Sequence, residues 1–342
     1  MINKLRLTNF KGVKQGEIEL SPLTILVGSN NSGKSTVLEA LFLAPNPARQ
    51  VLNMGTALDV VLKQHQMLGS QGTASLLHNY NAKEAKIECD IDGESYTLSF
   101  IRESEYIYLT SNKQRPEWSK ISFSLNGSNQ SGFAVASSFT GLNQYSDNKP
   151  FIGDTLLINS ELIKPSYDYL RQNWTLIMNS GAFQKVMREV SELSNETYTN
   201  VTLEPFFQNI NVIYAFLEDG RRIRLSDLGE GIQSYIVTKL IYEIVAPEVL
   251  LWDDIEAHLN PRMLVRLSDW FSDIIESGKQ IVITTHSIEA VKILAGANPK
   301  LTSILLTSLR HNNLKARHLP IEEIDNLSEA GIDVRMAEPF LL

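Results

Sequence analysis

The sequence predicts an α/β fold with a central, mostly parallel sheet, an antiparallel N-terminal β-layer and an inserted helical segment. First, the apolar run 23–27 leads into a glycine-rich loop and then into apolar residues at helical spacing, the order strand, loop, helix. Second, the apolar runs 248–252 and 280–285 end in polar side chains, as buried parallel strands do where ligands gather. Third, residues 3–9 and 17–20 alternate with period two and predict antiparallel strands.

The loop from Gly28 to Thr36 carries the most specific pattern in the chain. It reads Gly-Ser-Asn-Asn-Ser-Gly-Lys-Ser-Thr and fits G-x-x-x-x-G-K-[ST], the P-loop. Its glycines let the backbone bend close to a phosphate, its lysine can reach the β- and γ-phosphates, and its serine hydroxyl suits Mg²⁺. A chance Gly/Ser loop is the alternative, but the required strand and helix flank this one. The predicted nucleotide-binding residues are Gly28, Asn30, Asn31, Ser32, Gly33, Lys34, Ser35 and Thr36.

Composition limits the classes of protein that remain. Apolar residues make up 43% of the 342 residues and charged residues 20%, so a globular domain is expected rather than a disordered chain. No apolar run approaches the ~18 residues that span a bilayer, and Cys89 is the single cysteine. Together these features predict a cytoplasmic protein without a membrane partner. The net charge of −8 gives no compositional support for nucleic-acid binding, and DNA stays a candidate only through a local patch.

The chain reads as a single domain over 1–342 with three parts. They are an N-terminal P-loop lobe (1–110), a polar loop and helical insert (111–210), and a C-terminal lobe (211–342). Asp92-Gly93 and Asp219-Gly220 each stand between two strand-like segments, which predicts a β-hairpin at each. Residues 154–194 are expected to be helical, with one apolar face through Phe183, Val186, Met187, Val190 and Leu193 and another through Tyr169, Leu170, Trp174 and Ile177. The C-terminal lobe is expected to end in two strands, around 304–309 and 314–318, and a helix over 321–330.

Polar side chains stand at the ends of both later apolar runs. Asp253 and Asp254 follow the run at 248–252, and His286 follows the run at 280–285. In a P-loop protein the first such carboxylate is expected in the Mg²⁺ shell. A lone His is more often structural, but this one stands beside the predicted phosphate site. A further Gly-rich turn at 229–231 opens a helix; taken alone, a plain turn is the favoured interpretation.

The order of these motifs resembles the ABC-type ATPase head of SMC-like, RecF-like and overcoming-lysogenization-defect (OLD-like) proteins. The resemblance spans nearly the whole chain and rests on the opening Asn9–Gly12 with Leu23–Thr36, the signature loop Leu225–Gln233, the Walker B strand and D-loop Val249–Pro261, and the switch-histidine segment Thr284–Ser287. The tail Gly331–Arg335 is similar to the end of small OLD-like "AAA family" ATPases that lack a Toprim nuclease domain.

This resemblance implies that two heads pair head to tail with ATP between them. The P-loop of one copy would hold the phosphates, and the signature loop of the other would cap the γ-phosphate with Ser226, Gly229, Glu230, Gly231 and Gln233. The alignment within this loop is open, because the chain reads Leu-Gly-Glu-Gly rather than Leu-Ser-Gly-Gly. An ATP-dependent homodimer is therefore expected.

Catalytic roles also follow from the resemblance. Lys34 would neutralise phosphates, Ser35 and Asp253 would hold Mg²⁺, and His286 would contact the γ-phosphate. Asp254 stands where relatives carry the Glu that orients the attacking water; it is one methylene shorter, which predicts slow hydrolysis. Glu256 would assist catalysis or cap the loop.

Three further positions follow from the same comparison. Asn31 occupies a position where Gly is common, and Asn tolerates the left-handed conformation expected there. Asn260 stands near the usual D-loop Asp. A Q-loop glutamine has three unranked candidates, Gln64, Gln66 and Gln71.

The predicted function is Mg²⁺-dependent ATP hydrolysis by a head that couples its ATP cycle to DNA maintenance or antiviral defence through a protein partner. One alternative is a slow or non-hydrolysing module that uses ATP to control assembly, which the Asp at 254 favours. A less favoured alternative is the nucleotide-binding subunit of a membrane transporter; the long insert and the SMC-like opening argue against it.

Overall fold

The structure is a computed structural model of the chain. It describes residues 1–52, 54–64, 72–103, 106–111, 121–124, 154–194, 196–207, 210–257, 259–333 and 341–342.

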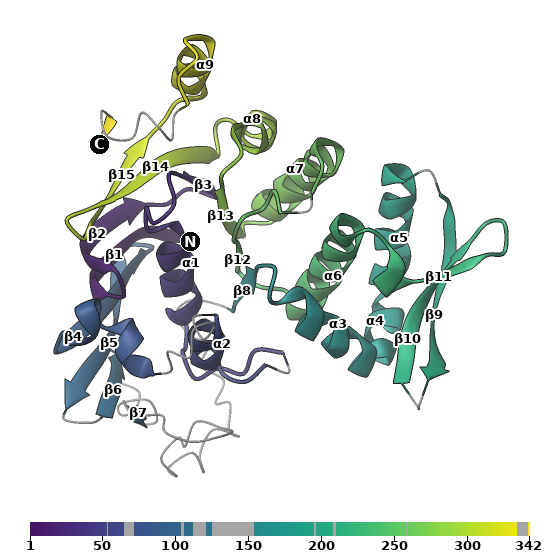
Figure 1. The fold of residues 1–342 in the computed structure, drawn as a ribbon, viewed down its shortest axis with the longest axis horizontal. Helices are drawn as coiled ribbons and strands as arrows, with labels where there is room; N and C mark the ends of the chain where they lie inside the picture. Colours follow the sequence, from purple (N-terminus) through teal and green to yellow (C-terminus); the bar gives the residue numbers. More distant parts are fainter. Residues whose placement is uncertain are drawn as a thin grey trace.

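The secondary structure alternates between strands and helices along the chain (Figure 1). The strands are β1 (Ile2–Phe10), β2 (Val13–Glu19), β3 (Leu23–Val27), β4 (Glu84–Ile91), β5 (Glu94–Glu103), β6 (Tyr106–Ser111), β7 (Ile121–Ser124), β8 (Thr155–Ile158), β9 (Tyr198–Phe207), β10 (Ile210–Leu217), β11 (Arg222–Arg224), β12 (Val249–Trp252), β13 (Gln280–Thr285), β14 (Thr302–Arg310) and β15 (Asn313–His318). The helices are α1 (Lys34–Leu43), α2 (Ala57–Lys63), α3 (Ile163–Gln172), α4 (Trp174–Ser180), α5 (Ala182–Leu193), α6 (Glu230–Val245), α7 (Pro261–Glu276), α8 (Ile288–Ala297) and α9 (Ile321–Glu329), with short 3₁₀ turns at Thr73–Leu76, His78–Tyr80 and Leu225–Asp227.

The predicted central parallel sheet is confirmed. Strands β8, β12, β13, β3 and β14 pair in parallel in that order. Thr285 of β13 lies opposite Val27 of β3, and Trp252 of β12 lies opposite Ile283. The carboxyl ends of these three strands therefore meet at one edge of the sheet, which is where ligands bind in open α/β sheets.

The predicted antiparallel strands near the N-terminus continue the same sheet. Its order is β7-β6-β5-β4-β1-β2-β15-β14-β3-β13-β12-β8, with β2 parallel to β15. The hairpins expected around Asp92-Gly93 and Asp219-Gly220 and the two C-terminal strands are all present. The N-terminal layer is thus not separate from the parallel strands, because β15 joins the two.

Helix α1 lies between the two parts of this sheet. Its apolar residues, Val37, Leu38, Leu41 and Phe42, are at most 1% exposed. They share one hydrophobic cluster with residues of β1 and β4 and with Leu251 and Val282 of the parallel strands. The opposite face of the parallel strands packs on α6, α7 and α8. Burial on both sides fixes the start of α1, and with it the P-loop, against the sheet edge.

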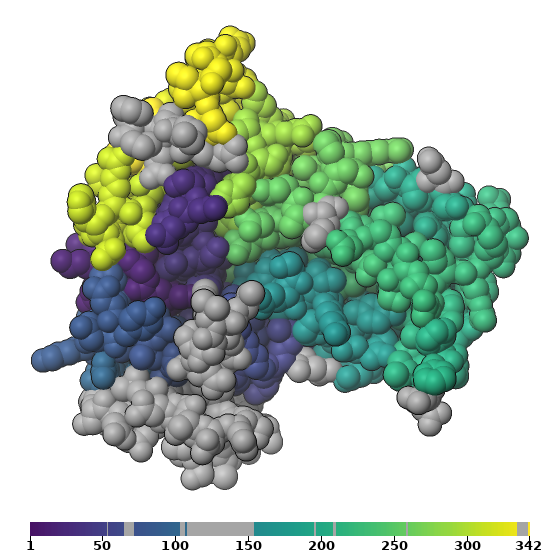
Figure 2. Space-filling view, viewed as in Figure 1, coloured from purple at the N-terminus to yellow at the C-terminus, as the bar shows by residue number. Residues whose placement is uncertain are grey.

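A second lobe carries the helical insert and a separate three-stranded antiparallel sheet, β11-β10-β9 (Figures 1 and 2). The predicted apolar face of α5 is confirmed, with Phe183 and Val190 fully buried. α5 and α6 form part of the same core. The division of the chain at 210/211 stays a proposal; the β9–β10 hairpin crosses it.

The expectation that residues 154–194 are helical is wrong at the start of this range. Residues Thr155–Ile158 form β8, a buried strand parallel to β12. This four-residue segment has only three apolar residues and is too short to show a period, so its type is decided by the neighbour it pairs with. Most of the polar stretch 111–149 lies outside the described residues, apart from Ser111 and β7. Among the residues that are described, no helix has the length and apolar character needed to cross a membrane.

Candidate nucleotide-binding site

The P-loop follows β3 and has the backbone that its sequence predicts. Asn31 has φ 63°, which confirms the left-handed conformation expected of it. Gly33 has φ 91° and caps α1, and a Cβ there would stand 2.8 Å from Leu314 Cδ1. A Cβ on Gly28 would stand 2.6 Å from the carbonyl oxygen of Thr307. Both glycines of the motif are therefore needed to let the loop fold against β14 and β15.

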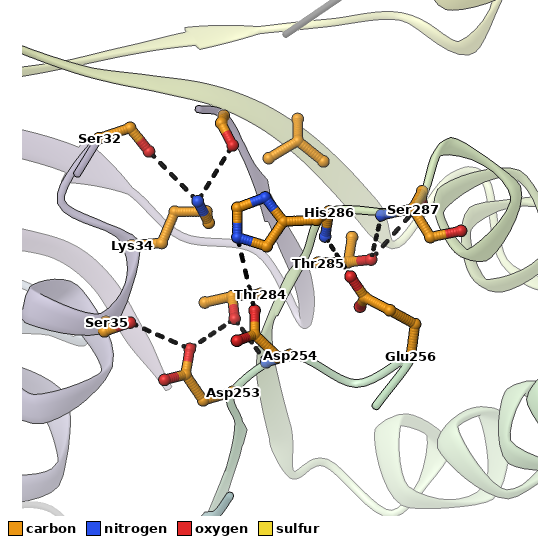
Figure 3. Close-up of polar contacts among 12 residues, drawn as sticks. Ser32, Lys34, Ser35, Asp253, Asp254, Glu256, Thr284, Thr285, His286 and Ser287 are labelled. Carbon is orange, nitrogen blue, oxygen red and sulfur yellow. Dashed lines mark hydrogen bonds and ion pairs between the residues drawn. The ribbon is translucent and has the colours of Figure 1, made fainter. Parts of the chain in front are cut away.

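Lys34 and Ser32 lie inside the loop (Figure 3). The Lys34 side chain is only 6% exposed, and its Nζ donates to the carbonyl oxygens of Gly28 and Ser29 at 3.0 Å each. The Ser32 hydroxyl is 3.1 Å from the Thr307 hydroxyl, which in turn donates to the carbonyl of Val27. The ammonium group is therefore held at the centre of the loop, where a phosphate would meet it.

Three oxygen-bearing side chains meet where α1, β12 and β13 converge. Asp253 Oδ1 accepts from the Thr284 hydroxyl at 2.6 Å and from the Ser35 hydroxyl at 3.3 Å. Burial raises the pKa of Asp253, and the hydrogen bonds from Thr284 and Ser35 oppose that rise only in part. The protein by itself therefore does not fully compensate the cost of burying this negative charge.

This donor set fits Mg²⁺. The ion prefers hard oxygen ligands and is bound in nucleotide sites by one or two carboxylates together with substrate phosphates. Ser35 and Asp253 supply one hydroxyl and one carboxylate at the same point. Within the described ranges no cluster of three or more His, Cys, Asp or Glu side chains could hold a metal by itself. The site therefore suits an ion that arrives with a phosphate chain.

Asp254, Glu256 and His286 lie beside this point (Figure 3). Asp254 Oδ1 is 3.7 Å from His286 Nε2. Asp254 has φ 49°, a conformation uncommon outside glycine, and its backbone N–H donates to the Thr284 hydroxyl at 2.8 Å. Glu256 Oε1 accepts from the backbone N–H of His286 at 2.5 Å. The structure therefore brings together all the predicted catalytic residues from three separate segments.

The predicted signature loop, Leu225–Gln233, lies in the other lobe and leads into α6 (Figure 1). Gly229 is the N-cap of α6, and Glu230 and Gly231 form its first turn. Ser226 and Gly229 are exposed, whereas Gly231 is buried. The Gln233 amide donates to the carbonyls of Ser226 and Leu228, so this side chain holds its own loop together. The N–H groups at the start of α6 point out of a helix N-terminus, a favourable position for an anion.

Sequence reasoning gave no role to two threonines that organise the site, Thr284, which it named only within the switch-histidine segment, and Thr307. Thr284 bonds to both Asp253 and the Asp254 backbone, and Thr307 supports the P-loop. A Thr in an otherwise apolar buried strand is the only signal that marks either one.

The two remaining sets of predicted positions have different outcomes. Asn260 caps α7 by accepting from the Met263 N–H. Of the Q-loop candidates, Gln66 and Gln71 lie outside the described residues. Gln64 follows α2, where its backbone N–H donates to the Val60 carbonyl, and its assignment stays a prediction.

Comparison with known proteins matches most of the chain to one family. The family model described as "AAA domain, putative AbiEii toxin, Type IV TA system" matches residues 23–292. This range runs from the strand before the P-loop into the helix after His286. It therefore contains every predicted site residue.

Individual relatives agree with this match. A protein of Helicobacter pylori (strain ATCC 700392 / 26695) named "ATP/GTP phosphatase" is 23% identical over 86% of this chain and 87% of its own length. Among solved structures, an SMC head bound to the C-winged helix domain of ScpA superposes with a TM-score of 0.56 at 19% identity. That match covers 94% of this chain and 99% of the SMC head, so the shared fold extends over both lobes.

Proposed function

This chain belongs to the family of AAA domains described as putative AbiEii toxins of type IV toxin–antitoxin systems and has the fold of an SMC-like ABC-type head; from this premise we propose that it is a Mg²⁺-dependent ATPase whose ATP cycle controls the association of two copies. One observation carries the proposal. Lys34, Ser35, Asp253, Asp254 and His286 converge at one sheet edge from separate segments. The placement in the OLD-like subgroup stays a prediction.

Each group in the site has a physical task in this reaction. Lys34 and the loop N–H groups hold and neutralise the phosphates, which is the main way proteins promote phosphoryl transfer. Ser35 and Asp253 would hold Mg²⁺, which supplies further neutralisation of the phosphate charge. Asp254 orients the attacking water and accepts its proton, and His286 contacts the γ-phosphate. The His286–Asp254 separation of 3.7 Å supports action of these two side chains on the same phosphate group.

Association of two copies is supported by the exposed start of α6. Gly229 is the exposed N-cap of α6, where glycine is a favoured residue, and a Cβ added to it would meet no atom of the described residues within 4 Å, so the helix N-terminus is open to a ligand. A γ-phosphate approaching from another copy would account for that small residue and for the outward N–H groups. ATP would then hold two heads together, and hydrolysis would release them.

ATP turnover tests the enzymatic part of this proposal. Removing the Lys34 charge in Lys34→Ala should lower kcat/KM on the order of 10²-fold or more, and Asp254→Asn should lower kcat with ATP binding retained. Lys86→Ala is the matched control, because it removes a partly exposed lysine of β4 that pairs only with Glu84 among the ion pairs described. A wild-type protein no faster than Lys34→Ala would end the enzymatic proposal.

Particle size tests the assembly part. The mass in solution should double when ATP and Mg²⁺ are added to the Asp254→Asn variant, because this variant is expected to bind ATP without hydrolysing it. The same measurement with DNA present tests nucleic-acid binding. A mass that stays at one copy with saturating ATP and Mg²⁺ would contradict ATP-dependent pairing.

A second candidate function is an ATP-gated assembly module with little hydrolysis. Asp254 favours it, because a carboxylate one methylene shorter lies farther from the water, and displacement by ~1 Å costs on the order of 10²-fold in rate. Asp254→Glu discriminates between the two. A large gain in turnover would indicate a protein tuned to hydrolyse slowly, whereas an unchanged rate would remove the reason for this candidate.

A protein partner completes the proposal. The similar SMC head is bound to a winged-helix domain, and the family description refers to toxin–antitoxin systems. We infer a cytoplasmic role in DNA maintenance or antiviral defence in which such a partner senses the ATP state. Copurification from cells of Asp254→Asn and Lys34→Ala compares the two states. A partner retained equally by both variants would contradict ATP-dependent coupling.

A further inference from the structure

Glu256 is held differently from the two aspartates that precede it. One carboxylate oxygen, Oε1, accepts the backbone N–H of His286 at 2.5 Å. The other, Oε2, is buried and has no hydrogen-bond partner among the described residues. A buried acceptor without a partner costs free energy, so the loop keeps this carboxylate in place against a penalty. Such an arrangement indicates that the hydrogen bond between Oε1 and the His286 backbone has a function.

The loop that carries Glu256 is attached to the end of β13 at several points. The Asp254 N–H donates to the Thr284 hydroxyl at 2.8 Å, and the Ile255 N–H donates to the Thr284 carbonyl at 3.1 Å. Both of these contacts end on Thr284, whereas the Glu256 contact reaches two residues further, to His286. The His286 imidazole in turn faces Asp254 Oδ1 at 3.7 Å. The backbone of His286 is therefore held by the Glu256 carboxylate, and its ring lies beside the Asp254 carboxylate.

We propose that Glu256 is a positioning residue for His286, and that it does not act as the base for the attacking water. A base must reach the water whose proton it takes. Oε1 is occupied by a backbone N–H, and Oε2 is buried. Glu256 instead fixes the backbone of His286, and with it the direction of the imidazole toward the γ-phosphate. This inference rests on the proposed ATPase function and deepens it.

Two substitutions separate positioning from base chemistry. Glu256→Gln keeps an oxygen that can accept the His286 N–H but removes the negative charge. Glu256→Met has a similar length and removes the acceptor. Positioning predicts that Glu256→Met lowers kcat on the order of 10²-fold, because the imidazole is displaced by ~1 Å, with little change in ATP affinity. Glu256→Gln should lose much less than Glu256→Met does.

A double substitution distinguishes positioning of His286 from a general effect on the structure, because it measures whether the two changes in kcat are additive. If Glu256 acts through His286, then Glu256→Met should have little further effect on kcat in a His286→Ala background, because the two changes remove one shared effect. Additive losses would overturn the proposal. A Glu256→Gln variant as slow as Glu256→Met would overturn it too, since a base loses its function with its charge. If Glu256→Met does not fold, a loss of on the order of 10²-fold or more in Glu256→Gln relative to wild type overturns the proposal by itself.

Amide hydrogen exchange tests the contact without any turnover. In the nucleotide-free protein, the peptide containing His286 should exchange faster in Glu256→Met than in wild type and at the wild-type rate in Glu256→Gln. Equal exchange in all three proteins would overturn the proposal. Should wild type hydrolyse ATP no faster than Lys34→Ala, the proposed function fails, and the exchange measurement still decides whether Glu256 holds His286.

Discussion

The two glycine-rich turns of this protein differ in what requires their glycines. In the P-loop, a Cβ on Gly28 would stand 2.6 Å from the carbonyl oxygen of Thr307, and Gly33 has φ 91°. In the predicted signature loop, Gly229 has φ −58°, and a Cβ there would meet no atom of the described residues within 4 Å. The first turn needs glycine in order to fold, whereas no contact among the described residues of one copy requires it in the second.

The two turns also differ in how they are held within one copy of the protein. The P-loop is tied to the sheet by the Ser32–Thr307 and Ser35–Asp253 contacts. The predicted signature loop is braced by its own Gln233 and by the Arg224–Asp227 ion pair, and it has exposed residues at a helix N-terminus. Glycine is a favoured N-cap residue, and at Gly229 it also leaves the start of α6 open. We infer that a nucleotide held by a second copy binds at this open helix N-terminus.

The largest expected effect comes from a negative charge at Gly229. Gly229→Asp places a favoured N-cap residue before α6, so the melting temperature should not fall. Its carboxylate would repel a γ-phosphate approaching the loop. We expect ATP-dependent association of two copies to weaken by roughly 10²-fold, about 2.7 kcal/mol, as measured by sedimentation with ATP and Mg²⁺.

Gly229→Asn is the matched control, because it caps the helix equally well without the charge. It should weaken association less than Gly229→Asp does. If both variants associate as wild type does, the signature loop does not face a phosphate, and the contrast between the two turns has another cause.

A smaller effect is expected at the first turn. Gly28→Ala forces a Cβ against the Thr307 carbonyl and the Ser32 hydroxyl, and overpacking of this kind costs about 1–3 kcal/mol. The free energy of unfolding, measured by denaturant titration without nucleotide, should fall by that amount. Gly229→Ala is the comparison, for which we expect a much smaller loss. Equal losses at the two glycines would contradict the distinction drawn between the turns.

The smallest expected effect is a gain in stability at the metal position. Because burial raises the pKa of Asp253, its ionised form is disfavoured in the native protein. That penalty is present above the native pKa and disappears as the pH falls below the unfolded value of about 3.9. Asp253→Asn should therefore raise the nucleotide-free melting temperature at about pH 7.5, with the difference shrinking toward about pH 4.

The same Asp253→Asn variant should lose Mg²⁺-dependent turnover. Thermal melts across this pH range without metal, followed by turnover with Mg²⁺, give both results on one sample. A variant that melts below wild type at neutral pH would show that the Thr284 and Ser35 hydrogen bonds outweigh burial at this carboxylate.

Most of the fold and of the site could be predicted, because they depend on patterns within short stretches of the sequence. The P-loop, the acidic end of β12 and the histidine after β13 each stand directly after an apolar strand, and parallel pairing brings such ends to one edge. β8 could not be predicted, because its three apolar residues show no period and become a strand only by pairing with β12. The antiparallel strands were predicted, but their continuity with the parallel strands depends on β15, far along the chain.

The sequence alone determined which chemical groups this protein has and which strand or loop carries each, because those features depend on neighbours within a few residues. Only the tertiary structure decided how the groups contact one another: Thr284 on Asp253, Thr307 on Ser32, and Glu256 on the backbone of His286. These contacts join segments about 30 to 275 residues apart. No local pattern encodes them, because each depends on the register of the strands and on the side chains that burial brings together.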